Sequence, residues 1–409
     1  MNNDLGARAA ELDAADPLAG FRDRFVGAES DLVYFDGNSL GRPLKATAER
    51  MANFVVSDWG GRLIRGWDEQ WFEAPLALGD EIGRVCIGAA PGQTAVGEST
   101  TVWLYKLIYA AVAGQLARDP RRNEIVVPVD DFPTDRYVVE GIAAQLGGRV
   151  VWLDAGTTAG VTAELLAGVL SERTALVVIS HVTYRSGFLA DAAGLTQQVH
   201  AAGGLVLWDL CHSVGSVEVA LDAWGADLAV GCTYKYLNGG PGSPAFGYVA
   251  ARHQGELQQP IQGWMGHADP FLMGPGYRPS AGMRRFLSGT PPITGMLGMR
   301  DMLALIEEVG MPAVRAKSVA LTTFAAEVCG QLLPDVEFAS PPAQLRGGHI
   351  TLRHEAMKAV NATLWEQDVL PDYRDPGGLR IGLSPLSTSF DEVWRGLQAV
   401  RTELSRLAG

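Results

Sequence analysis

The sequence predicts an α/β fold with a mostly parallel sheet, followed by a smaller C-terminal α+β lobe. Short, continuous apolar runs recur through the middle of the chain, stretches of helical character separate them, and the pattern changes near residue 300. Continuous apolar runs are typical of strands that are buried on both faces of a parallel sheet. Alternation of such strands with helices is typical of an α/β domain.

The predicted strands of the sheet are residues 123–129, 149–153, 174–180, 204–209 and 226–231. Residues 134–146 are predicted to form a helix, because the stretch can be capped at its start and its apolar side chains recur along one side. After about residue 300 the pattern predicts two helices and two short strands, at 312–332, 391–407, 349–353 and 379–383. These pieces form the predicted C-terminal lobe.

Composition excludes several classes of protein. The 409 residues are 47% hydrophobic and 19% charged, which is typical of a globular protein large enough for a main core and a smaller lobe. A net charge of -13 disfavours nucleic-acid binding. The apolar runs are too short for a membrane helix, and the N-terminus lacks the pattern of a secretory signal. We therefore expect a cytoplasmic enzyme with no membrane partner.

The four cysteines are scattered, without the CxxC spacing of metal-binding or redox motifs. This spacing argues against a disulfide framework and against a zinc site. We therefore expect no metal.

Polar and charged side chains lie where the predicted strands end. They are found at residues 131–135 and at Ser180, Asp209 and Lys235. In open α/β sheets the ligand crevice lies at the carboxyl ends of the strands. The sequence therefore predicts a functional site at this edge of the sheet.

Lys235 is the first candidate for chemistry. It follows the predicted strand 226–231 and precedes a loop rich in glycine, residues 238–243. Glycines allow the backbone to turn sharply and to approach a ligand closely. A lysine in a partly desolvated pocket can act as a nucleophile toward an aldehyde. The alternative is a solvated lysine beside a tight turn.

Asp209 strengthens the case for Lys235, because it ends a neighbouring predicted strand. Pyridoxal phosphate (PLP) requires an acidic group at its pyridine nitrogen, since the protonated ring is the electron sink. An aspartate and a lysine at adjacent strand ends therefore indicate PLP. The alternative for Asp209 is a helix N-cap. His212 would face the same crevice if a turn begins at Asp209, and it would otherwise be a packed histidine.

Two further features suit this cofactor. Residues 97–101 precede an apolar stretch, 102–112, that is predicted to be helical, and a helix N-terminus binds phosphate well. The alternative there is a simple Ser/Thr cap. Phe132 offers an aromatic face that could stack on a flat heterocycle, although it could equally be a core residue.

A series of longer motifs gives a family resemblance. The motifs occur in one order and span nearly the whole chain: Tyr34-Phe-Asp-Gly-Asn-Ser-Leu-Gly41, Phe132-Pro-Thr-Asp135, Trp208-Asp-Leu-Cys-His-Ser213, Cys232-Thr-Tyr-Lys-Tyr-Leu-Asn238, Gly263-Trp-Met-Gly-His267 and Ser288-Gly-Thr-Pro-Pro-Ile293. The ordered set resembles kynureninase, particularly its bacterial members.

The resemblance implies the PLP-dependent transferase fold type I, as a homodimer with active sites at the subunit interface. It also implies a division of the chain. Residues 1–50 would contribute to the small domain and the active site, 51–300 would form the large PLP-binding domain, and 301–409 would form the small C-terminal domain.

The resemblance further implies the residues that hold PLP. Lys235 would carry the cofactor covalently, Asp209 would pair with the pyridine nitrogen, and Phe132 would stack on the ring. The other implied cofactor residues hold the phosphate, lie near the ring or come from the second subunit, and they are Thr100, Thr101, Asp135, Ser180, His212, Tyr234, Trp264 and Thr290. The last two would belong to the second subunit.

On the substrate side, the resemblance implies Ser39, Trp67 and Arg380. A guanidinium suits a bidentate contact with the substrate carboxylate, which is the role implied for Arg380. The alternative for Arg380 is a surface residue on an edge strand. Trp67 could form a flat wall for an aryl ring, or it could serve packing alone.

The implied activity is hydrolysis of the Cβ–Cγ bond of L-kynurenine, 3-hydroxykynurenine or a ring-substituted analogue, giving an anthranilate-type acid and L-alanine. Lys235 is the natural base for the Cα proton, and Tyr234 could act as an acid at Cβ. The setting would be tryptophan catabolism or a specialised biosynthetic pathway. Trp103 and Cys211 depart from the residues more usual in the family. The bulk of Trp103 predicts a reshaped pocket, which keeps a ring-substituted substrate open.

Two alternatives remain. Another fold type I enzyme, such as an aminotransferase, would share the lysine, the aspartate and the arginine, whereas a cysteine desulfurase would need a mobile cysteine and Cys329 lies in a predicted helix. A non-catalytic, metabolite-sensing homologue would have lost Lys235, Asp209 or Arg380. All three residues are present.

Overall fold

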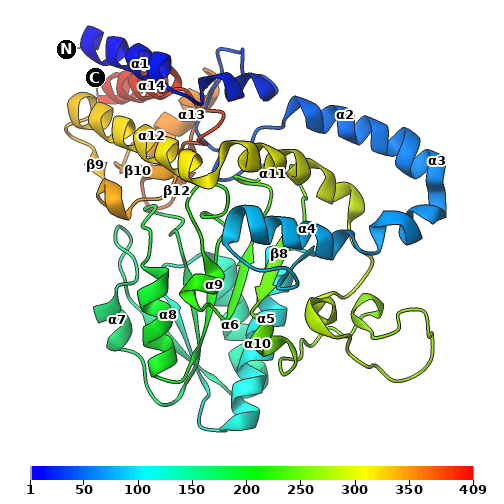
Figure 1. The fold of residues 1–409 in the computed structure, drawn as a ribbon. Helices are drawn as coiled ribbons and strands as arrows, with labels where there is room; N and C mark the ends of the chain where they lie inside the picture. The colour runs from blue at the N-terminus through cyan, green and yellow to red at the C-terminus, as the bar shows by residue number, and fades with distance from the viewer. Residues whose placement is uncertain (1, 409) are drawn as a thin grey trace.

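The computed structural model describes residues 2–408, and its centre is a seven-stranded sheet (Figure 1). The strand order is β2-β8-β7-β6-β5-β3-β4. The bounds are β2 Thr94–Gly97, β3 Glu124–Pro128, β4 Arg149–Leu153, β5 Thr174–Ser180, β6 Leu205–Asp209, β7 Leu228–Gly231 and β8 Ala245–Val249. Strands β3 to β7 are parallel, as predicted. The antiparallel strands β8 and β2, which complete one side of the sheet, were not predicted.

Helices cover both faces of this sheet because alternate strand residues point in opposite directions. Val178 and Leu207 pack with helices α5 (Thr100–Arg118) and α6 (Pro133–Leu146). Val177 and Trp208, their neighbours in sequence, face the opposite core. The helices of that second face are α4 (Ala74–Ile82), α8 (Ala192–Ala201) and α11 (Leu297–Val309). The predicted doubly covered α/β domain is confirmed.

The C-terminal lobe contains an antiparallel sheet of four strands in the order β12-β13-β10-β9. These strands are β9 Glu337–Phe338, β10 His349–Arg353, β12 Asp372–Arg374 and β13 Gly378–Gly382. The accompanying helices are α12 Met311–Leu332, α13 Met357–Trp365 and α14 Phe390–Ala408. The predicted helices and strands after residue 300 are thus confirmed.

The N-terminal segment packs on the C-terminal lobe (Figure 1). Helix α1 (Asn2–Ala15) lies beside α14, and β1 (Val33–Tyr34) pairs with β11 (Val369–Leu370) in parallel. Asp36 then forms a bridge to Gly382 at the end of β13. This return of the chain brings residues 36–41 close to the strand that carries Arg380. The division of the chain near residues 50 and 300 stays a prediction.

Two segments project from the body of the molecule (Figure 1). The first, the projecting arm, is residues 45–71 and includes α2 (Lys45–Asn53) and α3 (Gly60–Arg62). The second, the projecting loop, is residues 262–290 and contains only short 3-10 turns. Both expose large apolar side chains, with Ile64 76% exposed and Met273 81% exposed.

Small helices complete the large domain: α7 Ala163–Ala167, α9 Leu221–Trp224 and α10 Ala251–Gln254. Within residues 2–408, no helix combines the length and the apolar character that crossing a bilayer requires.

Candidate active site

The carboxyl ends of β5, β6 and β7 bring together the side chains that the sequence singled out. Ser180 and Asp209 are the last residues of adjacent parallel strands and lie opposite each other in the register. Lys235 follows β7, the next strand in the sheet. All three side chains are buried. The strand ends at this edge therefore bring the predicted lysine and aspartate together.

Lys235 contacts His212. Its Nζ lies 3.2 Å from His212 Nε2, and both residues are more than nine-tenths buried. Burial lowers the pKa of His212 well below its usual 6.5, and the positive charge of Lys235 lowers it further. His212 is therefore neutral at pH 7 and can accept a hydrogen bond from the Lys235 ammonium.

Three buried carboxyl groups lie beside this pair: Asp131, Asp135 and Asp209. Burial raises the pKa of Asp135 well above 3.8, and the charges of Asp209 and Asp131 raise it further. Burial raises the pKa of Asp131 to about 6, although a hydrogen bond from Ser180 Oγ at 2.5 Å lowers it in part. Asp135 thus holds a proton that it can share with Asp209, because neighbouring buried carboxylates resist ionising together.

Phe132 lies over the Lys235 amine. Its ring centroid is 6.0 Å from Lys235 Nζ, and the ring of Tyr184 meets it edge-on at 5.4 Å. The position follows from the local sequence, since Phe132 is the N-cap residue of α6 and Pro133 opens that helix. Phe132 is 37% exposed, so a flat ligand could stack on its free face.

The N-terminus of α5 supplies a site for an anion. Ser99 caps the helix through its side chain, and Thr100 and Thr101 form the first turn, where backbone N–H groups have no partner within the helix. Thr100 Oγ1 lies 4.0 Å from the sulfur of Cys211, which places this turn next to the strand end that carries Asp209. The neighbouring Cys232 and then burial raise the pKa of Tyr234 above its usual 10, so its hydroxyl remains a donor.

Arg380 is a buried residue of β13 and not a surface residue of an edge strand. It is 2% exposed, and its Nη2 donates to Ser39 Oγ at 2.9 Å. Ser39 lies in the segment that β1 brings back onto the C-terminal lobe. The structure therefore joins two of the three residues that the sequence placed on the substrate side.

Three predicted site residues lie elsewhere in this chain. Trp67 meets Trp71 edge-on at 5.7 Å and lines an open apolar pocket of about 360 Å³ with Pro291 and Pro292. Trp264 packs on Phe72 and Phe271, and Thr290 is exposed. Trp67 belongs to the projecting arm, Trp264 belongs to the projecting loop, and Thr290 is the last residue of that loop.

Trp103 does not line the crevice. It is fully buried in the core beneath the sheet, its Nε1 donates to Gly97 O at 2.6 Å, and its ring fills the space left by Gly247. The prediction that its bulk reshapes the pocket is therefore wrong. The reason is helical periodicity, which turns residue 103 toward the sheet while Thr100 faces the helix end.

Sequence reasoning missed His349, Tyr184 and Asp372. His349 is fully buried at the start of β10, with its ring centroid 5.7 Å from that of His212. Burial and then the charge of Arg380 lower its pKa to about 3. Tyr184 gives its backbone oxygen to Arg380, and Asp372 gives a carboxylate oxygen. The contacts of His349 and Tyr184 join segments far apart in the sequence, whereas Asp372 lies eight residues before Arg380 and meets it through the pairing of β12 with β13.

The residues of the crevice fit PLP on four counts. A lysine amine lies at the strand ends, an aromatic face lies above it, and the N-terminus of a long helix lies beside it. In addition, Asp135 Oδ2 is buried and has no hydrogen-bond partner. An orphaned buried carboxyl oxygen is costly unless a ligand or a water satisfies it. By contrast, the described part of the chain has no group of three or more His, Cys, Asp or Glu side chains placed to hold a metal.

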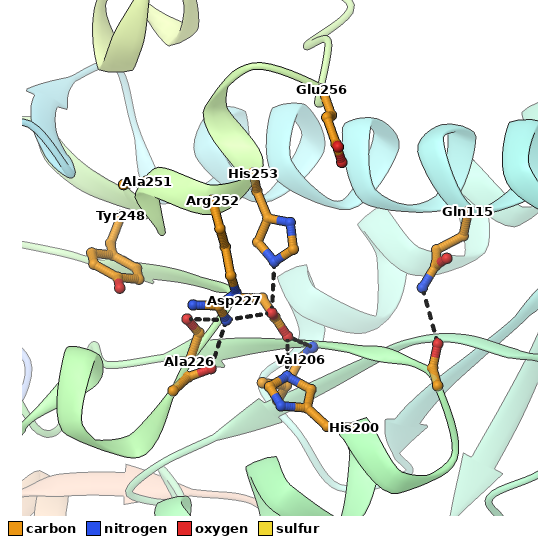
Figure 2. A network of polar contacts seen from close by, with 12 residues as sticks. Gln115, His200, Val206, Ala226, Asp227, Tyr248, Ala251, Arg252, His253 and Glu256 are labelled. Carbon is orange, nitrogen blue, oxygen red and sulfur yellow. Dashed lines mark hydrogen bonds and ion pairs between the residues drawn. The ribbon is translucent and has the colours of Figure 1, made fainter.

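A second polar network surrounds Asp227 (Figure 2) and lies where β6 and β7 begin, at the other end of these strands from Lys235. Asp227 precedes β7, and its carboxylate accepts hydrogen bonds from His200 at 2.8 Å, His253 at 2.7 Å, Arg252 at 2.6 Å and the Val206 N–H at 2.9 Å. Burial alone would raise the pKa of Asp227, but the hydrogen bonds outweigh it and hold the pKa far below 3.8. This network is structural, since it joins β6, β7, α8 and α10 on the side away from Lys235.

We expect Asp227→Asn to lower the free energy of unfolding by about 3 kcal/mol, because the change removes the charge of a buried carboxylate that accepts four hydrogen bonds. The depressed pKa means that the carboxylate stabilises the fold above about pH 4 and that this stabilisation is lost as the pH falls further. Urea unfolding of variant and parent at pH 7 and pH 3 measures both effects. An equal difference at the two pH values would contradict the charge-based explanation.

Known proteins resemble this chain over nearly its whole length. The kynureninase C-terminal domain family model matches residues 314–400. The kynureninase of Burkholderia pseudomallei is 41% identical over 400 residues, covering 96% of this chain and 94% of the relative. That of Pseudomonas fluorescens is 39% identical over 402 residues, covering 97% and 94%.

Solved structures show the same fold at low sequence identity. A C-DES mutant with glycine covalently linked to its PLP cofactor aligns with a TM-score of 0.81 at 18% identity, covering 93% of this chain and 98% of the other. The Escherichia coli cysteine desulfurase CsdA aligns with a TM-score of 0.78 at 17% identity, covering 95% and 98%. The predicted fold type I is thereby confirmed. With relatives at about 40% identity over nearly its whole length, the chain belongs to the kynureninase family.

Proposed function

We propose that this protein hydrolyses the Cβ–Cγ bond of L-kynurenine or 3-hydroxykynurenine, releasing an anthranilate-type acid and L-alanine. Membership of the kynureninase family confirms the predicted class, a PLP-dependent hydrolase acting on carbon–carbon bonds. The observation that carries the proposal is the contact of Lys235 Nζ with a neutral His212, beside a buried carboxyl cluster. A cytoplasmic location and the pathway remain predictions.

PLP bound at the crevice would supply a protonated ring that takes up the electron pair left when bonds to Cα and Cβ break. Among the residues present, Asp209 would face the pyridine nitrogen, Phe132 would stack on the ring, and the first turn of α5 with Tyr234 would hold the phosphate. Asp135 would support Asp209, because its raised pKa keeps a proton on Asp135 that it can donate toward Asp209.

The chain's own groups can move the protons that the reaction needs. Lys235 can take the Cα proton, and His212 at 3.2 Å can accept a hydrogen bond from the protonated amine. A water oxygen adds to the γ-carbonyl carbon, the Cβ–Cγ bond breaks, and Cβ takes a proton. Tyr234 is the proposed donor of that proton, since its raised pKa keeps the hydroxyl protonated. Arg380 would hold the α-carboxylate, with Ser39 beside it.

Two copies of the chain are proposed to form each complete site. Trp67, Trp264 and Thr290 lie on or next to projecting segments, where the exposed side chains include Val56, Trp59, Ile64 and Phe271. Exposed apolar groups of this extent indicate a protein interface, and C2 dimers are its commonest form. A partner could then present these three residues to the Lys235 crevice. Sedimentation of the purified holoenzyme as a single chain would contradict this arrangement.

Product analysis tests the proposed activity. L-Kynurenine and 3-hydroxykynurenine are added separately to the protein carrying PLP, and the aryl acid and alanine are quantified together. Equal molar release of the two products from either substrate is the expected result, and the two rates give the ring preference. Formation of a keto acid in place of alanine would favour an aminotransferase. Since Trp103 lies in the core, it gives no support for an unusual ring substituent.

A further inference from the structure

The N–H donors of Arg380 lie on two edges of its guanidinium group. Nε and Nη2 form the side edge, and Nη1 and Nη2 form the end edge. On the side edge, Nε donates to Asp372 Oδ2 at 2.6 Å, and Nη2 forms an ion pair with the same oxygen. On the end edge, Nη2 donates to Ser39 Oγ at 2.9 Å, and Nη1 also donates one hydrogen bond, to Tyr184 O at 2.9 Å. Of the five N–H groups of a guanidinium, one on Nη1 is left for a ligand.

The register of the C-terminal sheet explains why Asp372 takes the side edge. Asp372 on β12 lies directly opposite Arg380 on β13, so both side chains leave the sheet on the same face. Arg374, two residues on, shares that face and lies opposite Gly378, which has no side chain to obstruct it. Arg374 Nε reaches back to Asp372 Oδ2 at 2.8 Å. Asp372 is therefore held between two arginines.

The guanidinium of Arg380 lies next to the predicted cofactor site. Tyr184, whose oxygen it contacts, packs against Phe132, and Phe132 lies over Lys235. A carboxylate that arrives from the crevice would meet Nη1 and Nη2 and could replace Ser39 Oγ at Nη2. Asp372 does not occupy that edge, so its position is that of a brace and not of a competitor.

We propose that Asp372, anchored by Arg374, is a positioning residue that fixes the guanidinium of Arg380 with its end edge toward the α-carboxylate of the amino-acid substrate. This inference deepens the proposed function and rests on Arg380 as the carboxylate site. A planar guanidinium binds a carboxylate in a bidentate manner only when its orientation is fixed. Asp372 thereby sets the preference for substrates with a free α-carboxylate.

The test uses Asp372→Asn, which keeps the size of the side chain but removes its charge. For the holoenzyme, we expect the KM for L-kynurenine to rise about tenfold or more while kcat changes less than about threefold, because the change weakens binding and leaves Lys235 in place. The Kd for L-alanine, followed by the absorbance of the bound cofactor, should rise equally. The Kd for ethylamine, which has no carboxylate, should stay the same.

Two further variants guard against general damage to the fold. Arg374→Gln removes only the anchor from a half-exposed position and should raise the same KM by a smaller factor, about threefold. Glu337→Gln removes a carboxylate that pairs with Arg353 on the same sheet, and it should leave the KM unchanged.

In an Arg380→Lys background, Asp372→Asn should add little to the KM, since the guanidinium that Asp372 braces is absent.

Any of three other outcomes would overturn the proposal. An unchanged KM in Asp372→Asn would show that Arg380 needs no brace, and a lowered KM would show that Asp372 competes with the substrate carboxylate. An equal loss of ethylamine and L-alanine binding would show general disruption of the site. The comparison of L-alanine with ethylamine does not depend on bond cleavage. It can therefore support the role of Asp372 even if kynurenine proves not to be the substrate.

Discussion

Replacement of Lys235 by alanine is expected to lower kcat for L-kynurenine by at least about 10⁴-fold. The reason is that one amine performs two tasks. It would hold the cofactor covalently, and it is the group at the strand ends best placed to take the Cα proton. The variant should also lose the absorbance band that reports the covalent link, which is read by spectroscopy independently of turnover.

Two variants control for this result. Lys235→Arg keeps a cation next to His212 but offers no amine that can link to an aldehyde, so it should be as inactive as the alanine variant. Lys358→Ala removes an exposed lysine from α13 and should behave as the parent. Retention of turnover by Lys235→Ala within about tenfold of the parent would disprove the central assignment.

Replacement of Asp209 by asparagine is expected to lower kcat by about 10²–10³-fold and to weaken cofactor binding. Loss of one partner from a buried charge pair costs about 3–5 kcal/mol, and each 1.36 kcal/mol corresponds to about tenfold. Asparagine keeps the size of the side chain but cannot keep a pyridine nitrogen protonated. The measurements are the kcat for L-kynurenine and the Kd for PLP, obtained by titrating the apoprotein.

Asp227→Asn provides the matched control for this experiment. Asp227 is likewise a buried aspartate beside a strand of the central sheet (Figure 2). It precedes β7, however, whereas Asp209 ends β6, so the two lie at opposite ends of the strands. It should lower stability while leaving the PLP Kd and kcat unchanged at a temperature where both proteins are folded. If the two variants affected PLP binding equally, the loss would reflect the fold and not a contact with the cofactor.

The parallel sheet and the crevice could be predicted because their signals are local. Continuous apolar runs such as those of β5 and β6 identify buried strands, and the end of each run places Ser180 and Asp209 at one edge of the sheet. Lys235 and His212 follow by the same reasoning, and their contact at 3.2 Å agrees with it. The antiparallel strands β2 and β8 gave no comparable signal.

The sequence by itself determined the family, the fold and the residues at the strand ends, because local patterns and ordered motifs contain that information. Only the tertiary structure decided which distant groups meet. It turned Trp103 into the core, brought Ser39 onto Arg380, and placed His349 beside His212. The physical reason is that these contacts depend on strand register and on the return of the N-terminal segment. Both are fixed by packing over the whole chain and not by any short stretch of it.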